Sequence, residues 1–270
     1  MAICSTLIGG ISVSLADIFK GIFIEYDRDV AIVVELRFPR IFVSILGGAA
    51  MAVAGVLLQA VTRNPLTDPG IIGISSGSAF FAVLATALLP ALSFFAPVFS
   101  FLGGMLAFVI VSALSMKGGM SSTRLILVGL AVSTFFSALS TAFGQLTGGN
   151  SYAQSIVDGI IKSKTWDDVT VMAIFVAVGG ISCVFCVKRC NILALSDRLV
   201  GNIGINVSHT RLAVSTVAVL LSAASTAIVG AVSFLGLIVP HIARLLVGND
   251  HKKLIPYSAL LGALFFLAAD

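Results

Sequence analysis

The side chains that could do nucleophilic or metal chemistry are few in this sequence, and they do not gather. Cys183, Cys186 and Cys190 lie in one apolar run at a spacing that puts them on one helix face. A tetrahedral metal site needs thiolates that converge on one point, which an unbroken helix does not provide. Packing in an apolar interior is the favoured interpretation. We therefore expect no metal site and no bound cofactor.

The histidines give no better case for catalysis. His209, His241 and His251 each fall at the end of an apolar stretch, with no second histidine at helical spacing and no nucleophile beside them. His241 follows Pro240 and is better explained as a polar cap. The pattern Gly-x-x-x-x-Gly-Lys-Ser/Thr, which cradles nucleotide phosphates, is absent from the sequence. We expect that this chain is not an enzyme.

The composition points to a membrane protein. Of the 270 residues, 58% are hydrophobic and only 10% are charged, and the mean hydropathy is +1.11. Soluble domains carry roughly 25% charged residues. The net charge of +4 comes from 16 basic and 12 acidic residues, not from one basic face. Soluble globular domains, disordered tails, coiled coils and nucleic-acid binders are excluded.

Glycines, prolines and charge clusters divide the chain into eight apolar stretches, each a candidate span. They are residues 41–61, 71–90, 92–116, 124–146, 169–187, 211–229, 230–247 and 254–269. Because Gly230, Gly236 and Pro240 disfavour one long helix over 211–247, we expect two crossings there, one of them short or broken. Residues 150–164 are too short to cross and are typical of a re-entrant or interfacial helix.

The charged residues separate when successive connections are placed on alternate sides. The side opposite residues 12–40 would hold Arg63, Lys117, Arg124, Lys188, Arg189, Arg198, Arg211, Arg244, Lys252 and Lys253, against only Asp68, Asp197 and Asp250. Because basic loops stay in the cytoplasm, we assign this side as the inner one.

The spans carry no Asp, Glu, Lys or Arg at their centres. Ion-coupled carriers usually place an ionisable residue at that depth, so any transport is expected to be driven by a partner. Ser133, Ser137, Ser140 and Thr141 follow one side of a span. Such small polar residues pack helices closely or line a pore, and both interpretations stay open.

Two inner segments and one outer segment stand out. Residues 63–70 contain two X-Pro steps and predict a rigid, non-helical connection. Residues 191–208 mix apolar and charged side chains and predict one or two short amphipathic helices on the cytoplasmic face. Arg37 and Arg40 lie outside, where they either reach lipid phosphates or bind carboxylates of an extracytoplasmic protein.

Long motifs in this order resemble the permease subunits of bacterial ABC importers for ferric siderophores, haem and cobalamin. They are ELRFPR at 35–40, residues 48–59, NPLTDPG at 64–70, GISSG at 73–77 and GAVSFLGLIVPHIAR at 230–244. The resemblance runs from about Gly10 to Asp270. It implies an all-α polytopic membrane protein, the type II ABC importer permease bundle. The family has ten spans, of which we expect about eight complete ones and an N-terminal stub here.

The resemblance also implies partners. These are a second permease subunit in a homo- or heterodimer, two cytoplasmic ATPase subunits that bind ATP, an extracytoplasmic substrate-binding protein and membrane lipid, with no nucleic acid. The chain would lie in the bacterial inner membrane and carry a ferric siderophore, with cobalamin or haem as the alternative. We treat residues 1–270 as a single transmembrane domain and expect it to be truncated at both ends.

Site residues follow from the motif positions. The resemblance assigns Arg37 and Arg40 to the binding protein. It assigns the ATPase contact to Leu193, Leu195, Ser196, Asp197, Arg198, Gly201 and Gly204. The path and its gate would involve Asn64, Leu66, Ser122 and Thr123, and to these we add Ser133 and Ser137 from the polar stripe. Residues 160–164, where relatives are richer in glycine and serine, make the substrate the least secure inference.

Two other classes remain as alternatives. An ion- or proton-coupled carrier would transport without ATP, and the uncharged span centres speak against it. A truncated remnant without activity is the other.

Overall fold

The computed structural model describes residues 33–89, 91, 95–116, 121–146, 164–232 and 234–270, and the regular structure in these ranges is entirely helical. Each of the eight predicted apolar stretches forms a helix. They are α4 (Phe38–Thr62), α5 (Ile74–Leu88), α6 (Ala96–Ser115), α7 (Ser122–Leu146), α9 (Trp166–Leu193), α11 (Val207–Val229), α12 (Leu235–Val247) and α13 (His251–Ala269). A π-helical turn, η1 (Val33–Arg37), leads into α4, and the short α10 (Asp197–Asn202) joins α9 to α11.

The expectation of eight complete spans needs correction, because six of these helices are long and apolar enough to cross a membrane. Helix α12 has 13 residues and is the short member expected within 211–247, since the chain leaves α11 at Gly230 with φ 96°. Helix α5 has 15 residues and was expected to be longer. It begins only after Gly73, whose φ of +84° interrupts the helix.

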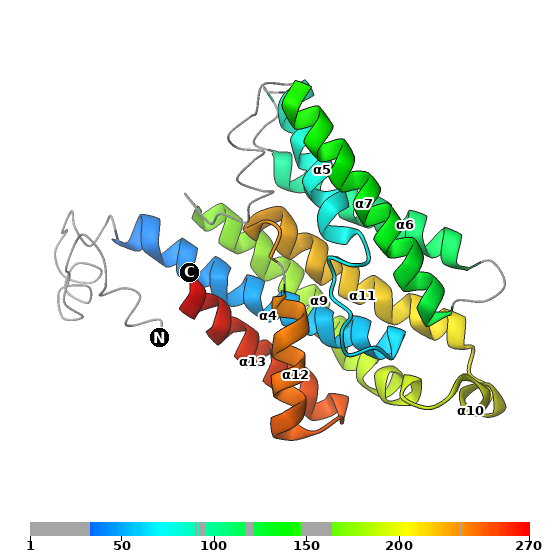
Figure 1. Cartoon of the computed structure of the whole chain (residues 1–270). Coiled ribbons are helices and arrows are strands. Elements are labelled where there is room, and N and C mark those ends of the chain that lie inside the picture. The colour runs from blue at the N-terminus through cyan, green and yellow to red at the C-terminus, as the bar shows by residue number, and fades with distance from the viewer. Residues whose placement is uncertain (1–32, 90, 92–94, 117–120, 147–163, 233) are drawn as a thin grey trace, which may run out of the picture.

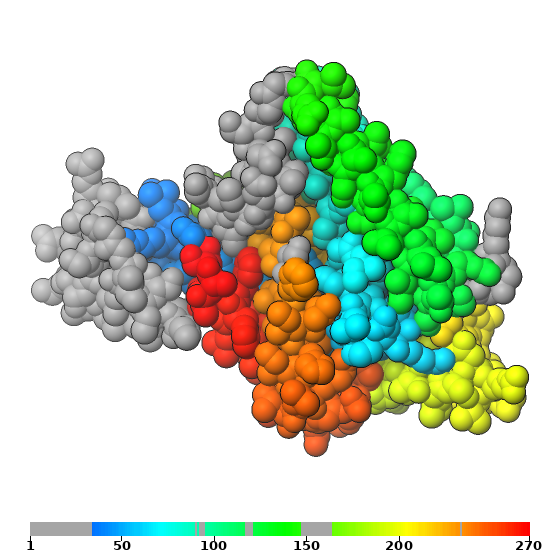
Figure 2. All heavy atoms as spheres, viewed as in Figure 1, coloured from blue at the N-terminus to red at the C-terminus, as the bar shows by residue number. Residues whose placement is uncertain are grey.

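Two helices form the centre of the bundle. In the most apolar stretch of α4, 78% of the residues are buried, and in that of α11 72% are, against 17% in α7 and 22% in α9. Figure 1 shows α4 running through the middle of the molecule, beside α11 and α13. Figure 2 shows α7 along one edge, open over its whole length. Helices α7 and α9 are therefore the ones that present apolar side chains to the outside.

Glycines let α4 approach its neighbours at backbone distance. A Cβ on Gly48 would overlap the carbonyl of Gly262 in α13, and a Cβ on Gly55 would overlap the carbonyl of Gly236 in α12. Small residues are what membrane helices use where backbones touch. These contacts tie α12 and α13 to α4.

Polar caps set the starts of four helices. Thr165 and Asp168 form a capping box before α9, with the Thr165 N–H donating to Asp168 Oδ2 at 3.0 Å. Ser196, Asn206 and Asp250 accept backbone N–H groups at the starts of α10, α11 and α13. Of the one or two short amphipathic helices predicted in 191–208, the structure forms one, α10. The helix predicted at 150–164 lies outside the described residues except at its last position.

Candidate functional site

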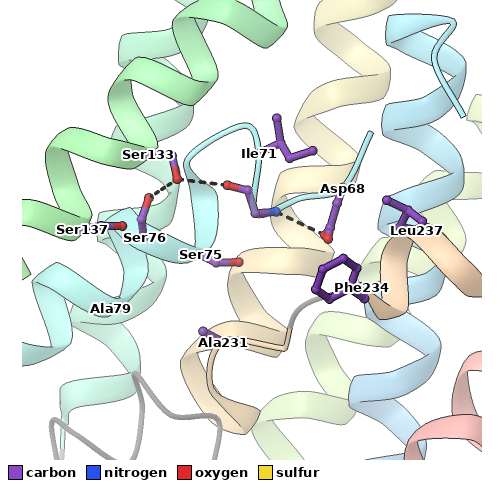
Figure 3. A pocket seen from close by; sticks show the side chains of 11 residues that line it. Asp68, Ile71, Ser75, Ser76, Ala79, Ser133, Ser137, Ala231, Phe234 and Leu237 are labelled. Carbon is purple, nitrogen blue, oxygen red and sulfur yellow. Dashed lines mark hydrogen bonds between the residues drawn. The ribbon is translucent and has the colours of Figure 1, made fainter. Parts of the chain in front are cut away.

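A cavity of about 440 Å³ opens between α5, α7 and the start of α12 (Figure 3). Its wall is formed by Asp68, Gly70, Ile71, Ser75, Ser76, Ala79, Ser133, Ser137, Ala231, Phe234 and Leu237. Four serine hydroxyls and one carboxyl face a space inside an otherwise apolar bundle. The cavity is therefore a polar-walled chamber, large enough for several waters or part of a ligand.

The chamber contains two of the six predicted path residues, Ser133 and Ser137. Ser133 Oγ donates to the Gly70 carbonyl at 3.2 Å and receives the Ser76 hydroxyl at 3.3 Å (Figure 3). Ser133 thus holds α7 against the loop that precedes α5, while Ser137 lies one turn further along the same helix face. Ser133 therefore packs α7 against this loop and both serines line the chamber, while a pore along the stripe stays a prediction.

Asp68 is a wall residue that the sequence analysis did not assign to the path. Its side chain lies in the 64–73 loop, the residue is only 7% exposed, and Oδ1 accepts the Gly70 N–H at 3.4 Å. Burial raises the pKa of Asp68 from 3.8 to about 6, against a smaller lowering by the Gly70 hydrogen bond. The available signal was a carboxylate placed between Pro65 and Pro69 at the end of an apolar stretch.

Phe234 is another wall residue that was not predicted, as are Ser75 and Ser76. It precedes α12 with φ 67° and ψ −20°, a left-handed conformation that a bulky residue rarely adopts. The side chain is 65% exposed and stands beside the chamber (Figure 3). An aromatic residue inside an apolar run gives no sequence signal of such a position.

The other four predicted path residues do not line the chamber. Asn64 lies on a second cavity, and its Oδ1 accepts the Leu66 N–H at 2.9 Å. Leu66 is 64% exposed and Thr123 is exposed, while Ser122 Oγ donates to the Val61 carbonyl at 3.5 Å. These four residues lie toward the inner end of α4 and α7, next to the chamber but outside its wall.

Asp197 is the centre of a charge cluster at the inner end. Its Oδ1 lies 2.7 Å from Arg63 Nη1 and 3.1 Å from Arg211 Nη2. Arg63 Nε also donates to the Leu193 carbonyl at 2.5 Å. Arg211 is only 3% exposed, so Asp197 balances the charge of a buried guanidinium. The carboxylate of α10 thereby binds α4, α9 and α11 together.

The remaining residues assigned to an ATPase contact have different positions. Leu193 is fully buried, Ser196 caps α10, Gly204 has φ +78°, and Arg198 and Gly201 are exposed. Beside them Leu195, Leu199 and Ile203, at a spacing of four, are 44%, 53% and 59% exposed. Helix α10 stands out from the inner end of the bundle in Figure 1. Leu199 lies within this helix, and Leu195 and Ile203 flank it.

At the outer end, Arg40 makes a two-pronged ion pair with Asp270. Nε and Nη2 donate to the two carboxylate oxygens at 2.8 Å each, and Ser44 Oγ lies 3.2 Å from Oδ2. Arg40 was expected to be open to a partner, whereas its guanidinium is engaged within the chain although 45% exposed. Arg37 ends η1, four residues before Ile41.

The FecCD transport family matches residues 1–270. The Fe(3+)-citrate import system permease protein YfmD of Bacillus subtilis is 35% identical over 265 residues, which are 97% of this chain and 79% of that protein. The probable heme-iron transport system permease protein IsdF of Staphylococcus aureus is 36% identical over 269 residues, 100% of this chain and 82% of that protein.

Solved structures show the same fold. An inward-facing conformation of a metal-chelate type ABC transporter superimposes with a TM-score of 0.86 at 30% identity, covering 100% of this chain and 85% of the other. PsaBC from Streptococcus pneumoniae in complex with Fab gives a TM-score of 0.61 at 18% identity over 93% of this chain and 84% of that one, which supports the fold alone.

Proposed function

The chain belongs to the FecCD transport family, and from this we propose how its described parts serve transport. It is an iron-chelate permease subunit of an ABC importer and a multi-pass protein of the bacterial cytoplasmic membrane. We propose a ferric siderophore as the substrate, with haem or cobalamin as the alternative. The observation that carries the path is the polar chamber between α5, α7 and α12.

The chamber suits a substrate that carries many oxygen atoms. Hydroxyls of Ser75, Ser76, Ser133 and Ser137 both donate and accept hydrogen bonds, so they exchange partners without trapping a chelate. Asp68 is the titratable residue of this wall, and when protonated it does not repel an anionic chelate. Phe234 narrows the same space from the α12 side.

Uptake measurements test the path with a matched pair of variants. Cells that lack their own permease receive the importer, and uptake of labelled ferric citrate, a ferric siderophore, haem and cobalamin is measured. Ser137→Trp fills the chamber and is expected to reduce uptake at least tenfold, whereas Ala142→Trp, at an exposed position on the opposite face of α7, leaves it near the parent level. Equal uptake by both variants would remove the chamber from the path. Uptake of cobalamin alone would replace the iron chelate as substrate.

We propose that α10 and its flanks seat in a cytoplasmic ATPase subunit. The exposed Leu195, Leu199 and Ile203 supply an apolar contact, and Asp197 passes a displacement of α10 to α4 and α11 through Arg63 and Arg211. ATP then binds the partner, and this chain needs no cofactor of its own. Leu199→Glu is expected to abolish ATPase binding while the exposed control Lys253→Glu retains it, as measured by co-purification.

We propose that Arg37 and Arg40 receive carboxylates of an extracytoplasmic binding protein, with a second permease subunit completing the assembly. Asp270 competes for Arg40, so the partner carboxylate must displace or share it. Replacing both arginines by glutamate is expected to weaken docking at least a hundredfold through like-charge repulsion. Unchanged docking in a pull-down titration would remove this role.

A further inference from the structure

A second cavity, of about 340 Å³, lies at the inner end of the bundle, apart from the polar chamber. It is bounded by the end of α4, the last turn of α9, the end of α12 and the start of α13. Its polar wall consists of Gln59, Arg63, Asn64, Arg244, Asn249 and His251. No acidic residue is part of this wall in the described chain, although two arginines are.

The two arginines differ in whether an anionic group pairs with the guanidinium. Arg63 is paired with Asp197 and with the Leu193 carbonyl. The side chain of Arg244 makes no ion pair within the described residues, and its Nη1 is buried without a partner. A guanidinium withdrawn from water and left without an anion is unfavourable, so an anion in this cavity would be held strongly.

His251 supplies an acceptor beside this cation. The residue is only 6% exposed. The Asn191 Oδ1 atom accepts the backbone N–H of His251 at 3.1 Å, which fixes the orientation of the Asn191 amide. The same oxygen lies 2.7 Å from His251 Nδ1. Nδ1 must then carry the proton and donate it. In the neutral ring Nε2 is a bare acceptor, and it is buried without a partner.

Gln59 supplies a second acceptor of the same kind. Its Nε2 donates to the carbonyls of Thr67 and Gly236 at 3.3 Å each, which fixes the orientation of the amide. Its Oε1 is buried and has no partner. The wall therefore combines unmet donors on a cation with two unmet acceptors, whereas buried polar groups are normally satisfied.

We propose that this cavity binds a hydrogen-bearing phosphate group. The anionic oxygens would accept from Arg244, with Arg63 adding charge, while a P–OH group would donate to His251 Nε2 or Gln59 Oε1. A carboxylate or sulfate is fully deprotonated at neutral pH and has no proton for these acceptors, so the wall discriminates against both. The site does not depend on the chamber or on any transport step.

The group has two possible sources, free inorganic phosphate and the monoester headgroup of phosphatidic acid. Leu245 and Leu246, next to Arg244, are 76% and 65% exposed, so apolar surface adjoins the cavity. The two sources share the same chemistry and differ in whether binding requires the lipid.

Binding is measured on the full chain in nanodiscs of phosphatidylcholine. Inorganic phosphate is titrated by calorimetry at pH 7, with sulfate as the comparison. We expect saturable phosphate binding and at least tenfold weaker sulfate binding. Saturable binding of both anions with equal affinity would overturn the proposal, because the acceptors would then have no part in recognition.

Variants assign the binding to this wall. Arg244→Gln and Asn249→Asp are each expected to weaken phosphate binding at least tenfold. Asn249 is an exposed residue of the cavity wall, so its replacement is not expected to disturb folding. Lys252→Gln changes the charge by the same amount as Asn249→Asp but lies off the wall, and it is expected to bind phosphate like the parent. Equal binding by Asn249→Asp and Lys252→Gln would overturn the assignment.

A lipid arm separates the two sources. If free phosphate does not bind, nanodiscs containing phosphatidic acid are expected to raise the thermal unfolding midpoint of the parent and of Lys252→Gln but not of Asn249→Asp. No response to either source would overturn the proposal. Transport activity enters neither measurement, so the outcome is independent of the proposed importer function.

Discussion

The two ends of the bundle are held by charges in different ways. At the outer end, in the part of the chain that the structure describes, the ion pair of Arg40 with Asp270 joins α4 to α13 at a partly exposed position. At the inner end Asp197 joins four helices through two arginines, one of them buried. A second set links Asn191 of α9 to Asp250 and His251.

The difference indicates where motion has to be transmitted. A single exposed pair contributes little to stability and is screened by salt. A cluster that includes a buried cation resists separation, since each displaced partner leaves an unmet charge. The inner end is therefore built to move as a unit, and the outer end to loosen.

The largest expected effect concerns Asp68, in the inner loop. The folded chain keeps this carboxyl protonated up to about pH 6, while the unfolded chain releases the proton near 3.8. The free energy of unfolding should therefore fall by up to about 3 kcal/mol as the pH rises from about 4 to about 6. Unfolding of the purified chain at stepped pH tests this. Asp68→Asn should remove the slope, and a slope that persists in the variant must arise elsewhere.

The Asp197 cluster comes second. Asp197→Asn leaves Arg211 without its carboxylate, and we expect a loss of about 2 kcal/mol in unfolding free energy, because Asp197 itself is half exposed. ATP hydrolysis should continue while uptake falls. The neighbouring Arg198→Gln is the matched control for stability. If both variants lose the same stability, the cluster does not distinguish the inner end.

The Asn191 contacts give a smaller effect. Asn191→Ala removes the donor to Asp250 Oδ1, at 2.9 Å, and the acceptor for the His251 N–H. We expect a loss of about 1–2 kcal/mol in unfolding free energy. Asn202→Ala, at the exposed end of α10, should change this free energy by less than about 0.5 kcal/mol. A difference between the two variants below that value would contradict the proposed link between α9 and α13.

The outer pair gives the smallest effect. Arg40→Gln should cost about 0.5–1 kcal/mol of unfolding free energy at low salt and less at high salt, because the side chain is 45% exposed. Denaturant titrations at two ionic strengths measure this. A loss as large as that of Asp197→Asn would break the contrast between the two ends.

The helices were predictable because apolar runs and their breakers are local signals. Gly230 and Pro240 indicated a break and a short helix within 211–247, and the break occurs at Gly230. Residues 71–73 were wrongly placed in the span because they are apolar, although the left-handed Gly73 keeps them out of α5. The hydropathy of residues 71–73 does not distinguish a turn from the start of a helix.

The site was predictable only in part. Ser133 and Ser137 follow from a visible stripe on one helix. Asn64 and Leu66 were placed on the path by their motif, but the packing of the 64–73 loop turns Asn64 to the other cavity. The partners of Asp197 lie 14 and 134 residues away. Contacts between such distant positions leave no local pattern in one sequence.

The contact of Gly55 with Gly236 gives the two sides of the chamber unequal stiffness. Helix α12 packs backbone to backbone on the buried α4, so we expect the wall that carries Phe234 to stay in place. The opposite wall belongs to α7, whose apolar stretch is only 17% buried. Gly129 of α7 packs on the backbone of Ile71 and Ile72, and Ser133 donates to the Gly70 carbonyl, so α7 and residues 70–72 are held together. We expect the aperture to change by a movement of α7 with this segment against a stationary α12, so a cross-link from α7 to α12 across the chamber would prevent the change.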